Sequence, residues 1–228
     1  MIRFVFLDLD DTILDFLKSE EVSLREVLLR EGIEPTEELV SLYSGINDAH
    51  WKLLEQGKLT REEVKLQRFQ VFFERIGVNA DAEAVRRFYE ARLAKSHYFI
   101  PGAEALLRDL YGKYRLYIMS NGSISAQEGR IAAAKIAPYF EQIFLSEQVG
   151  YNKPKKEFFE RCFASIPDFD REEAIILGDS LTSDIQGGIV AGIKTCWFNF
   201  RGHKRNPDII PDYEIHTLSE FSELLKQL

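Results

Sequence analysis

The chain lacks the residues and segments that mark several classes of protein. Its 228 residues include only two cysteines, Cys162 and Cys196, whose positions give neither a disulfide framework nor the spacing of a metal site. We expect both to be buried as small apolar side chains. No apolar run approaches the roughly 20 residues of a membrane span, and the N-terminus does not have the pattern of a signal peptide. We therefore expect a cytoplasmic protein without a membrane partner.

Positive charge is also scarce. The chain has 29 Lys and Arg against 37 Asp and Glu, which gives a formal net charge of -8. A nucleic-acid polymer requires a basic surface, so we expect no such partner. A small anionic substrate, such as a phosphorylated metabolite, could still bind where a metal ion and a few Lys or Arg supply local positive charge. Nothing in the sequence indicates the oligomeric state.

A pair of carboxylates stands at the end of the first apolar run. Residues 4–7 are apolar, and Asp8 and Asp10 follow them. Residues i and i+2 of a strand face the same way, and ligands of parallel α/β sheets bind at the carboxyl ends of the strands. A solvated acidic turn would have the same sequence. The spacing nevertheless favours an active site in which Asp8 and Asp10 converge.

Three later apolar runs, at 117–119, 144–145 and 174–177, also lead into polar residues. The polar residues are Ser120 and Asn121, then Lys153, then Asp179 and Asp184. The order is a carboxylate pair, a hydroxyl, a lysine and a second acidic pair. This order is a more specific signal of an active site than any one of these groups alone. The order resembles the four motifs of the haloacid dehalogenase-like (HAD) hydrolases, and the resemblance spans the chain.

The resemblance implies a role for each motif residue. Asp8 would be the nucleophile that forms an acyl phosphate, and Asp10 the general acid and base. Asp8, Asp179 and Asp184, with the backbone carbonyl of Asp10, would bind Mg²⁺, which prefers oxygen ligands. The phosphoryl group would be bound by Thr12, Ser120, Asn121 and Lys153.

The turn after Asp10 carries one departure from the family pattern. Many HAD phosphatases have Gly where this chain has Asp11, although an Asp tolerates turn geometry. We expect Thr12 to hydrogen-bond this turn and so to aim Asp10.

The segment between the first run and about residue 97 contains no convincing strand. It predicts four helices, at 19–31, 36–56, 60–76 and 81–96, with Gly after the first three and capping-box spacing at Thr60 and Glu63. From Pro101 onward helices and strands alternate, which predicts a parallel sheet that the first strand must join. We expect a three-layer, Rossmann-like α/β core at 1–15 and 98–228, interrupted by a helical-bundle cap (C1-type) at 16–97.

The cap is the expected source of substrate specificity. Four polar or aromatic residues interrupt the amphipathic pattern of its helices, and each is a candidate for contact with substrate: Asn47, His50, Trp51 and Arg68. The stretch 47–73, with the motifs at 10–16 and 178–184, resembles the YjjG/YfnB subgroup of pyrimidine 5′-nucleotidases. An aromatic side chain over a base ring is chemically sensible, because stacking tolerates several bases.

The function favoured by these features is Mg²⁺-dependent hydrolysis of a small phosphomonoester, most of all a nucleoside 5′-monophosphate. A sugar-phosphate or phosphoglycolate-type phosphatase is the alternative. A haloacid dehalogenase is less favoured, because that chemistry needs neither a metal nor the acid at Asp10. The core motifs do not exclude a mutase, whereas a non-catalytic binding module is disfavoured because every expected catalytic position is occupied.

Overall fold

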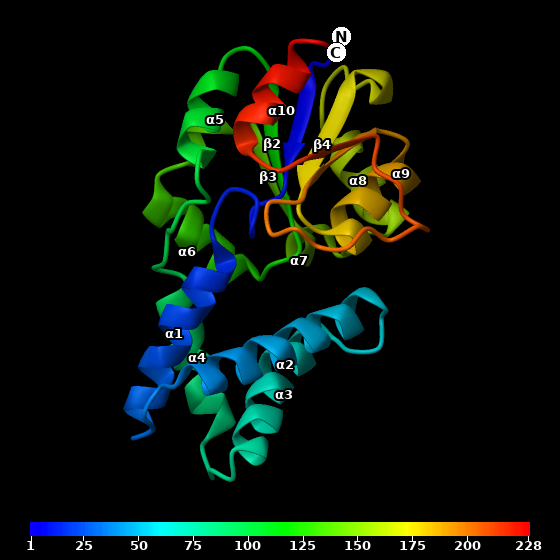
Figure 1. Cartoon of the computed structure of the whole chain (residues 1–228). Helices are drawn as coiled ribbons and strands as arrows, with labels where there is room; N and C mark the ends of the chain where they lie inside the picture. Colours follow the sequence, from blue (N-terminus) through cyan, green and yellow to red (C-terminus); the bar gives the residue numbers. More distant parts are fainter.

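The computed structural model describes residues 1–228 and contains a six-stranded parallel sheet, in which the four apolar runs supply β1 to β4 (Figure 1). The strand order is β3-β2-β1-β4-β5-β6, so β1 lies inside the sheet between β2 and β4. All four residues of β1 are buried, as expected for a strand with helices on both faces. The strands are β1 (Phe4–Leu7), β2 (Arg115–Ser120), β3 (Gln142–Leu145), β4 (Ala174–Gly178), β5 (Lys194–Phe198) and β6 (Tyr213–Ile215).

Helices cover both faces of this sheet. Val5 and Leu7 of β1 join an apolar cluster with helices α5 (Ala103–Leu110) and α10 (Leu218–Leu225). Phe4 and Phe6 join a second cluster with α8 (Lys156–Ala164) and α9 (Gln186–Ala191) on the other face. Two further helices lie between β2 and α8 along the chain: α6 (Ile124–Ala134) and α7 (Ser146–Val149). The predicted α/β class with three layers is confirmed, and both cysteines are buried and free.

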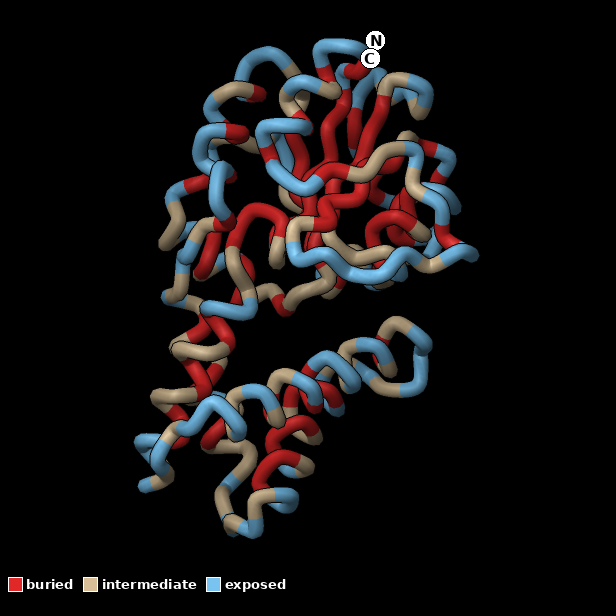
Figure 2. Tube along the Cα trace, in the orientation of Figure 1, coloured by how far each residue is buried: buried red, intermediate tan, exposed pale blue.

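Four consecutive helices form a separate unit between β1 and α5, which we call the helical unit (Figures 1 and 2). They are α1 (Phe16–Arg30), α2 (Glu37–Glu55), α3 (Arg61–Arg75) and α4 (Ala82–Leu93). Their inward faces share one apolar cluster, which also includes Ala126 of α6. The capping box predicted at Thr60 and Glu63 is present, and Gly57 and Gly77 follow α2 and α3 with positive φ, as the helix-end pattern requires. Figure 1 shows the unit beyond the carboxyl ends of the strands.

The two chain segments that join the helical unit to the core run side by side. Leu14 and Phe99 form an antiparallel bridge, and the backbone N–H of Asp15 donates to the carbonyl of Tyr98 at 2.8 Å. The unit also contacts the core where α4 packs against α6. A side chain at Gly129 of α6 would collide with Ala94, so this packing is close.

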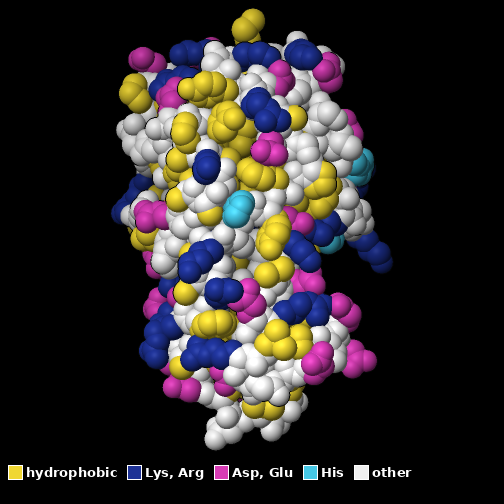
Figure 3. All heavy atoms as spheres, turned by 90° about the vertical axis from the view of Figure 1, so that its left-hand side faces the viewer, with side chains coloured by type: hydrophobic (Ala, Val, Ile, Leu, Met, Phe, Trp, Pro, Cys, Tyr) yellow, Lys and Arg dark blue, Asp and Glu magenta, His cyan; other side chains and the backbone are white.

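The surface mixes charges of both signs. On the face in Figure 3, Lys and Arg side chains are interspersed with Asp and Glu, and this face carries no continuous basic patch. In the helical unit the mixture includes ion pairs of Arg86 with Glu83 and Glu90. None of the helices is both long enough and apolar enough to cross a membrane.

Candidate active site

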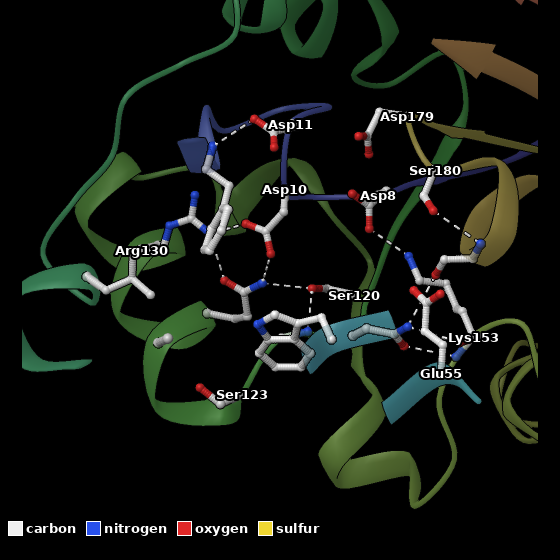
Figure 4. A pocket seen from close by; sticks show the side chains of 18 of the residues that line it. Asp8, Asp10, Asp11, Glu55, Ser120, Ser123, Arg130, Lys153, Asp179 and Ser180 are labelled. Atoms are coloured by element: carbon white, nitrogen blue, oxygen red, sulfur yellow. Dashed lines mark hydrogen bonds and ion pairs between the residues drawn. The ribbon is translucent and has the colours of Figure 1, made fainter. Parts of the chain in front are cut away.

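The ends of three neighbouring strands bring together the polar residues singled out in the sequence. Asp8 follows β1, and its N–H donates to Leu177 of β4 at 2.9 Å, which extends the sheet by one residue. Ser120 is the last residue of β2, and Asp179 follows β4. These residues line one pocket, which also contains Asp10, Lys153 and Asp184 (Figure 4). The predicted convergence at the carboxyl edge of the sheet is therefore observed.

Three carboxylates and one lysine form the centre of this pocket. Oxygen atoms of Asp8, Asp179 and Asp184 lie within 4.8 Å of one another. The Lys153 ammonium donates to Asp8 Oδ1, Asp184 Oδ1 and the Met119 carbonyl, at 2.6 Å each. The Asp184 carboxylate fits beside the end of β4 because Gly178 has no side chain. A Cβ atom at Gly178 would collide with this carboxylate.

Burial dominates the electrostatics of this cluster. It raises the pKa of Asp8 well above its ordinary value, and the nearby Lys153 charge only partly opposes the rise. Burial and the negative charge of Asp8 likewise raise the pKa of Asp179. For Lys153, burial alone would lower the pKa of the ammonium, but Asp184 and Asp8 raise it overall. Three carboxylates, of which Asp8 and Asp184 are buried and Asp179 is half-buried, outnumber the single lysine and offer an all-oxygen donor set, which fits a Mg²⁺ ion.

Asp10 lies outside this group of carboxylates and has different partners. Gln127 Nε2 donates to Asp10 Oδ2 at 2.6 Å, and Arg130 Nη1 forms an ion pair with Asp10 Oδ1. Gln127 Nε2 also lies 2.8 Å from Ser120 Oγ. Both Gln127 and Arg130 come from α6 and line the pocket, and neither was singled out in the sequence (Figure 4).

The structure places two of the predicted phosphate ligands, Asn121 and Thr12, differently from the prediction. The side chain of Asn121 is committed to the backbone of Lys153, accepting from its N–H at 2.9 Å and donating to its carbonyl at 3.0 Å. It also donates to Ser183 Oγ, so it holds the lysine in place and has no donor left for a phosphate. Thr12 is fully buried, and its hydroxyl has no hydrogen-bond partner.

The expected bond from Thr12 to the turn is therefore absent. The turn closes instead through its own backbone: the N–H groups of Ile13 and Leu14 both donate to the Leu9 carbonyl. Asp11 takes the left-handed conformation, with φ 56°, and its carboxylate accepts from the N–H of Phe16 at the start of α1. Asp11 thus holds the first residue of α1, whose N-cap is Asp15. Arg201 pairs with the same carboxylate at 2.9 Å.

The helical unit supplies one wall of the pocket, including Trp51 and Arg68. Asn47 lies behind both and does not line the pocket: its Oδ1 accepts from Trp51 Nε1 at 3.0 Å and from Arg68 Nη1 at 2.8 Å. His50 is not part of the lining either, and its ring contacts the Ile46 carbonyl. The predicted contact set of four therefore reduces to Trp51 and Arg68 at the pocket, with Asn47 as their support.

Polar contacts also connect the helical unit to the core. Arg61 Nη2 donates to the Asn121 carbonyl at 3.1 Å and to Asn152 Oδ1 at 2.8 Å. Thr182 of the core donates to Glu55 Oε2 at 3.1 Å. Because Asn121 holds Lys153, the Arg61 contact joins the helical unit to the residues around the carboxylates. The sequence carried no signal for this contact.

Comparison with known proteins agrees with this geometry. Residues 5–198 match the family described as haloacid dehalogenase-like hydrolase. The chain is 40% identical to the HAD-hydrolase YfnB of Bacillus subtilis (strain 168), over 98% of this chain and 95% of the relative. It is 36% identical to the pyrimidine 5′-nucleotidase PynA of Streptococcus pneumoniae, over 98% and 94%. It is 28% identical to the pyrimidine 5′-nucleotidase YjjG of Escherichia coli, over 97% and 96%.

Solved structures show the same likeness. The crystal structure of YfnB bound to magnesium, which reveals interdomain movement, superimposes with a TM-score of 0.94 at 39% identity, over 98% of each chain. A 2-haloacid dehalogenase from Pseudomonas syringae superimposes less closely, with a TM-score of 0.67 at 26% identity, over 100% of this chain and 99% of that one.

Proposed function

Because the chain belongs to the haloacid dehalogenase-like hydrolases, we propose that it is a Mg²⁺-dependent phosphatase for nucleoside 5′-monophosphates that acts through an aspartyl phosphate. One observation carries the proposal: Asp8, at the end of β1, lies in a buried cluster with two further carboxylates and Lys153. This is the arrangement that an attacking carboxylate needs when its target is a phosphate anion. The family membership confirms the resemblance that the motifs predicted.

In the proposed reaction, Asp8 attacks phosphorus and the bond from phosphorus to the leaving oxygen breaks. Asp10 gives a proton to that oxygen, and an acyl phosphate remains on Asp8. Asp10 then takes a proton from water as the water oxygen attacks phosphorus. The bond from phosphorus to the Asp8 oxygen breaks, which releases inorganic phosphate and regenerates the Asp8 carboxylate.

Lys153 and Ser120 are the phosphoryl-binding side chains in this proposal. Lys153 supplies positive charge to the transferring group, and the Ser120 hydroxyl binds one of its oxygens. Asp8, Asp179 and Asp184 would hold the Mg²⁺, which supplies charge neutralisation for the approach of carboxylate to phosphate. The excess of carboxylates over cations in this cluster supports the assignment.

We also propose that residues 16–97 act as a cap that recognises the part of the substrate beyond the phosphate. Trp51 and Arg68 line the same pocket as Asp8, and an indole can stack on a nucleobase. PynA and YjjG, to which the chain is similar, are named as pyrimidine 5′-nucleotidases. A dehalogenase would leave Asp10 without a task, although this residue lines the pocket and is held by two side chains.

The test measures phosphate release from pyrimidine and purine 5′-monophosphates, sugar phosphates, phosphoglycolate and p-nitrophenyl phosphate. Trp51→Ala should lower kcat/KM for the preferred nucleotide about 10- to 100-fold, since stacking is worth about 1–3 kcal/mol per base. It should change kcat/KM for p-nitrophenyl phosphate less than about threefold. His50→Ala is the matched control, because His50 is the preceding residue on α2 and does not line the pocket. Equal losses on both substrates in the Trp51 variant would contradict the nucleotidase proposal.

A further inference from the structure

The contacts of Asp10 with α6 form a closed arrangement of three side chains. Gln127 Nε2 binds one carboxylate oxygen at 2.6 Å, and Arg130 Nη1 binds the other. Arg130 Nη1 also donates to Gln127 Oε1 at 3.0 Å, so the two side chains brace each other. They are three residues apart on the same helix, which places them on one face. Both oxygens of Asp10 are therefore fixed from a single rigid element.

The burial of Arg130 is difficult to explain by stability alone. Its side chain is 1% exposed, and its one ion-pair partner is Asp10, which is 29% exposed. Its Nε and Nη2 groups are buried without hydrogen-bond partners. Removing a guanidinium from water in this way is strongly unfavourable, and one ion pair offsets that cost only in part. The burial of Arg130 beside Asp10 therefore indicates that Arg130 has a functional role in the active site.

Gln127 connects Asp10 to the end of β2. Its Nε2 bridges Asp10 Oδ2 and Ser120 Oγ, whose distance from Nε2 is 2.8 Å. A side chain at Gly122 would lie 2.1 Å from this Nε2, so the glycine after Asn121 leaves the space that Gln127 occupies. The Asp10 carboxyl group and the Ser120 hydroxyl are thus held at a fixed separation.

We infer that Gln127 and Arg130 are positioning residues that aim the Asp10 carboxyl group at the leaving oxygen, relative to a phosphoryl group bound at Ser120. The inference rests on the proposed function, in which Asp10 gives its proton to that oxygen. Neither α6 side chain exchanges a proton itself. Each acts by restricting the direction in which Asp10 points.

The experiment compares two leaving groups. A nucleoside alkoxide needs a proton as it departs, whereas p-nitrophenolate is stable without one, so only the nucleotide should depend on a well-placed acid. We use kcat/KM, because it covers the steps up to release of the leaving group. Arg130→Met should lower kcat/KM for a nucleotide at least 30-fold and for p-nitrophenyl phosphate less than threefold. Arg130→Lys, which keeps a cation, should recover part of the loss.

Gln127→Leu is the second variant, because it removes a hydrogen bond to Asp10 while the buried ion pair remains. It should show the same selective loss on the nucleotide, at about 10-fold. Glu128→Gln is the matched control, because Glu128 belongs to the same helix and its side chain contacts Gln148 outside the pocket. The control should retain the parent kcat/KM on both substrates. If Arg130→Met does not fold, judged by circular dichroism, Gln127→Leu alone decides.

Asp10→Asn separates failure of the inference from failure of the proposed function. If this variant lowers kcat/KM equally for both substrates, Asp10 is not the acid that protonates the leaving oxygen, and that part of the proposed function is wrong. If Asp10→Asn is selective but the α6 variants lose both activities equally or neither, the positioning role of Gln127 and Arg130 is overturned.

Discussion

Replacement of the buried Glu20 by glutamine should stabilise the protein in a pH-dependent way. Glu20 lies in α1, its residue is 2% exposed, and its Oε1 accepts from Asn47 Nδ2 at 2.7 Å. Burial raises the pKa of Glu20 from 4.5 to about 7, and the hydrogen bond from Ser44 and the positive charge of Arg68 only partly oppose the rise. At alkaline pH the folded protein therefore holds the ionised Glu20 carboxylate away from water, which is unfavourable.

The size of the effect follows from the shift. Each unit of pKa corresponds to about 1.4 kcal/mol, so a rise from 4.5 to about 7 corresponds to about 3 kcal/mol. The folded state binds the proton more tightly than the unfolded state, so stability is lost as the pH rises through about 7. Gln keeps an oxygen that can accept from Asn47 and never ionises. Glu20→Gln should thus be more stable than the parent by about 3 kcal/mol at pH 8.5, and the difference should vanish towards pH 4.5.

The assay is urea unfolding of parent and variant at several pH values between 5 and 8.5. Because about 1 kcal/mol shifts the Tm of a chain of this size by roughly 2–4 °C, thermal unfolding should show a gain of roughly 6–12 °C at pH 8.5. Glu34→Gln is the matched control, since Glu34 belongs to the same helical unit and is exposed. A difference that does not change with pH would refute the reasoning. So would a loss of stability at pH 8.5, because the attraction of Glu20 to Arg68 would then outweigh the cost of burial.

Three further predictions concern the core site. Asp8→Asn should abolish turnover with the fold intact, because the nearly isosteric change removes the attacking charge; more than a few per cent residual activity, with deamidation excluded by mass spectrometry, would contradict the nucleophile assignment. Lys153→Met should lower kcat/KM at least about 100-fold for nucleotide and aryl phosphate alike, because both substrates carry the phosphoryl group that Lys153 binds. In metal-free protein the same change should lower the free energy of unfolding by about 3–5 kcal/mol, because Asp8 and Asp184 remain buried without their cation. Loss of activity on one substrate only would contradict the phosphoryl-binding role of Lys153. Chelation should silence the enzyme, Mg²⁺ should restore activity and raise the Tm, and Ca²⁺ should substitute poorly; full activity after exhaustive chelation would exclude the metal site.

The carboxyl edge of the sheet was predictable because its signals are local. A short apolar run that ends in a carboxylate or hydroxyl fixes both the strand and the place where the polar side chain emerges. The same holds for the capping box at Thr60, in which both partners lie within one helical turn. Such residues could be assigned without knowledge of distant contacts.

The remaining site residues depend on how helices face the core, which the sequence does not encode locally. Successive residues of a helix point about 100° apart, so His50 and Trp51 look equivalent as candidates until the packing of α2 decides between them. Gln127 and Arg130 are ordinary polar residues of α6 until the helix is placed against Asp10. Asn121 stands beside Ser120 in the sequence, yet its partner is the backbone of Lys153, thirty-two residues away. These contacts exist only in the assembled fold.

The adjacent crossings at Leu14 and Phe99 have a consequence for how the protein can evolve. The backbone of Ile100 donates to Ile13 at 3.0 Å and that of Asp15 to Tyr98 at 2.8 Å, so the chain leaves the core and returns to it at nearly the same place. A hairpin turn of a few residues could join these two points without disturbing the sheet. The backbone of the helical segment is therefore joined to the core at one place, although α4 also packs against α6. Recombination at this junction could replace the wall that carries Trp51 and Arg68 while the strand ends that carry Asp8 and Lys153 stay unchanged, so preference for a substrate could be inherited separately from the ability to cleave it.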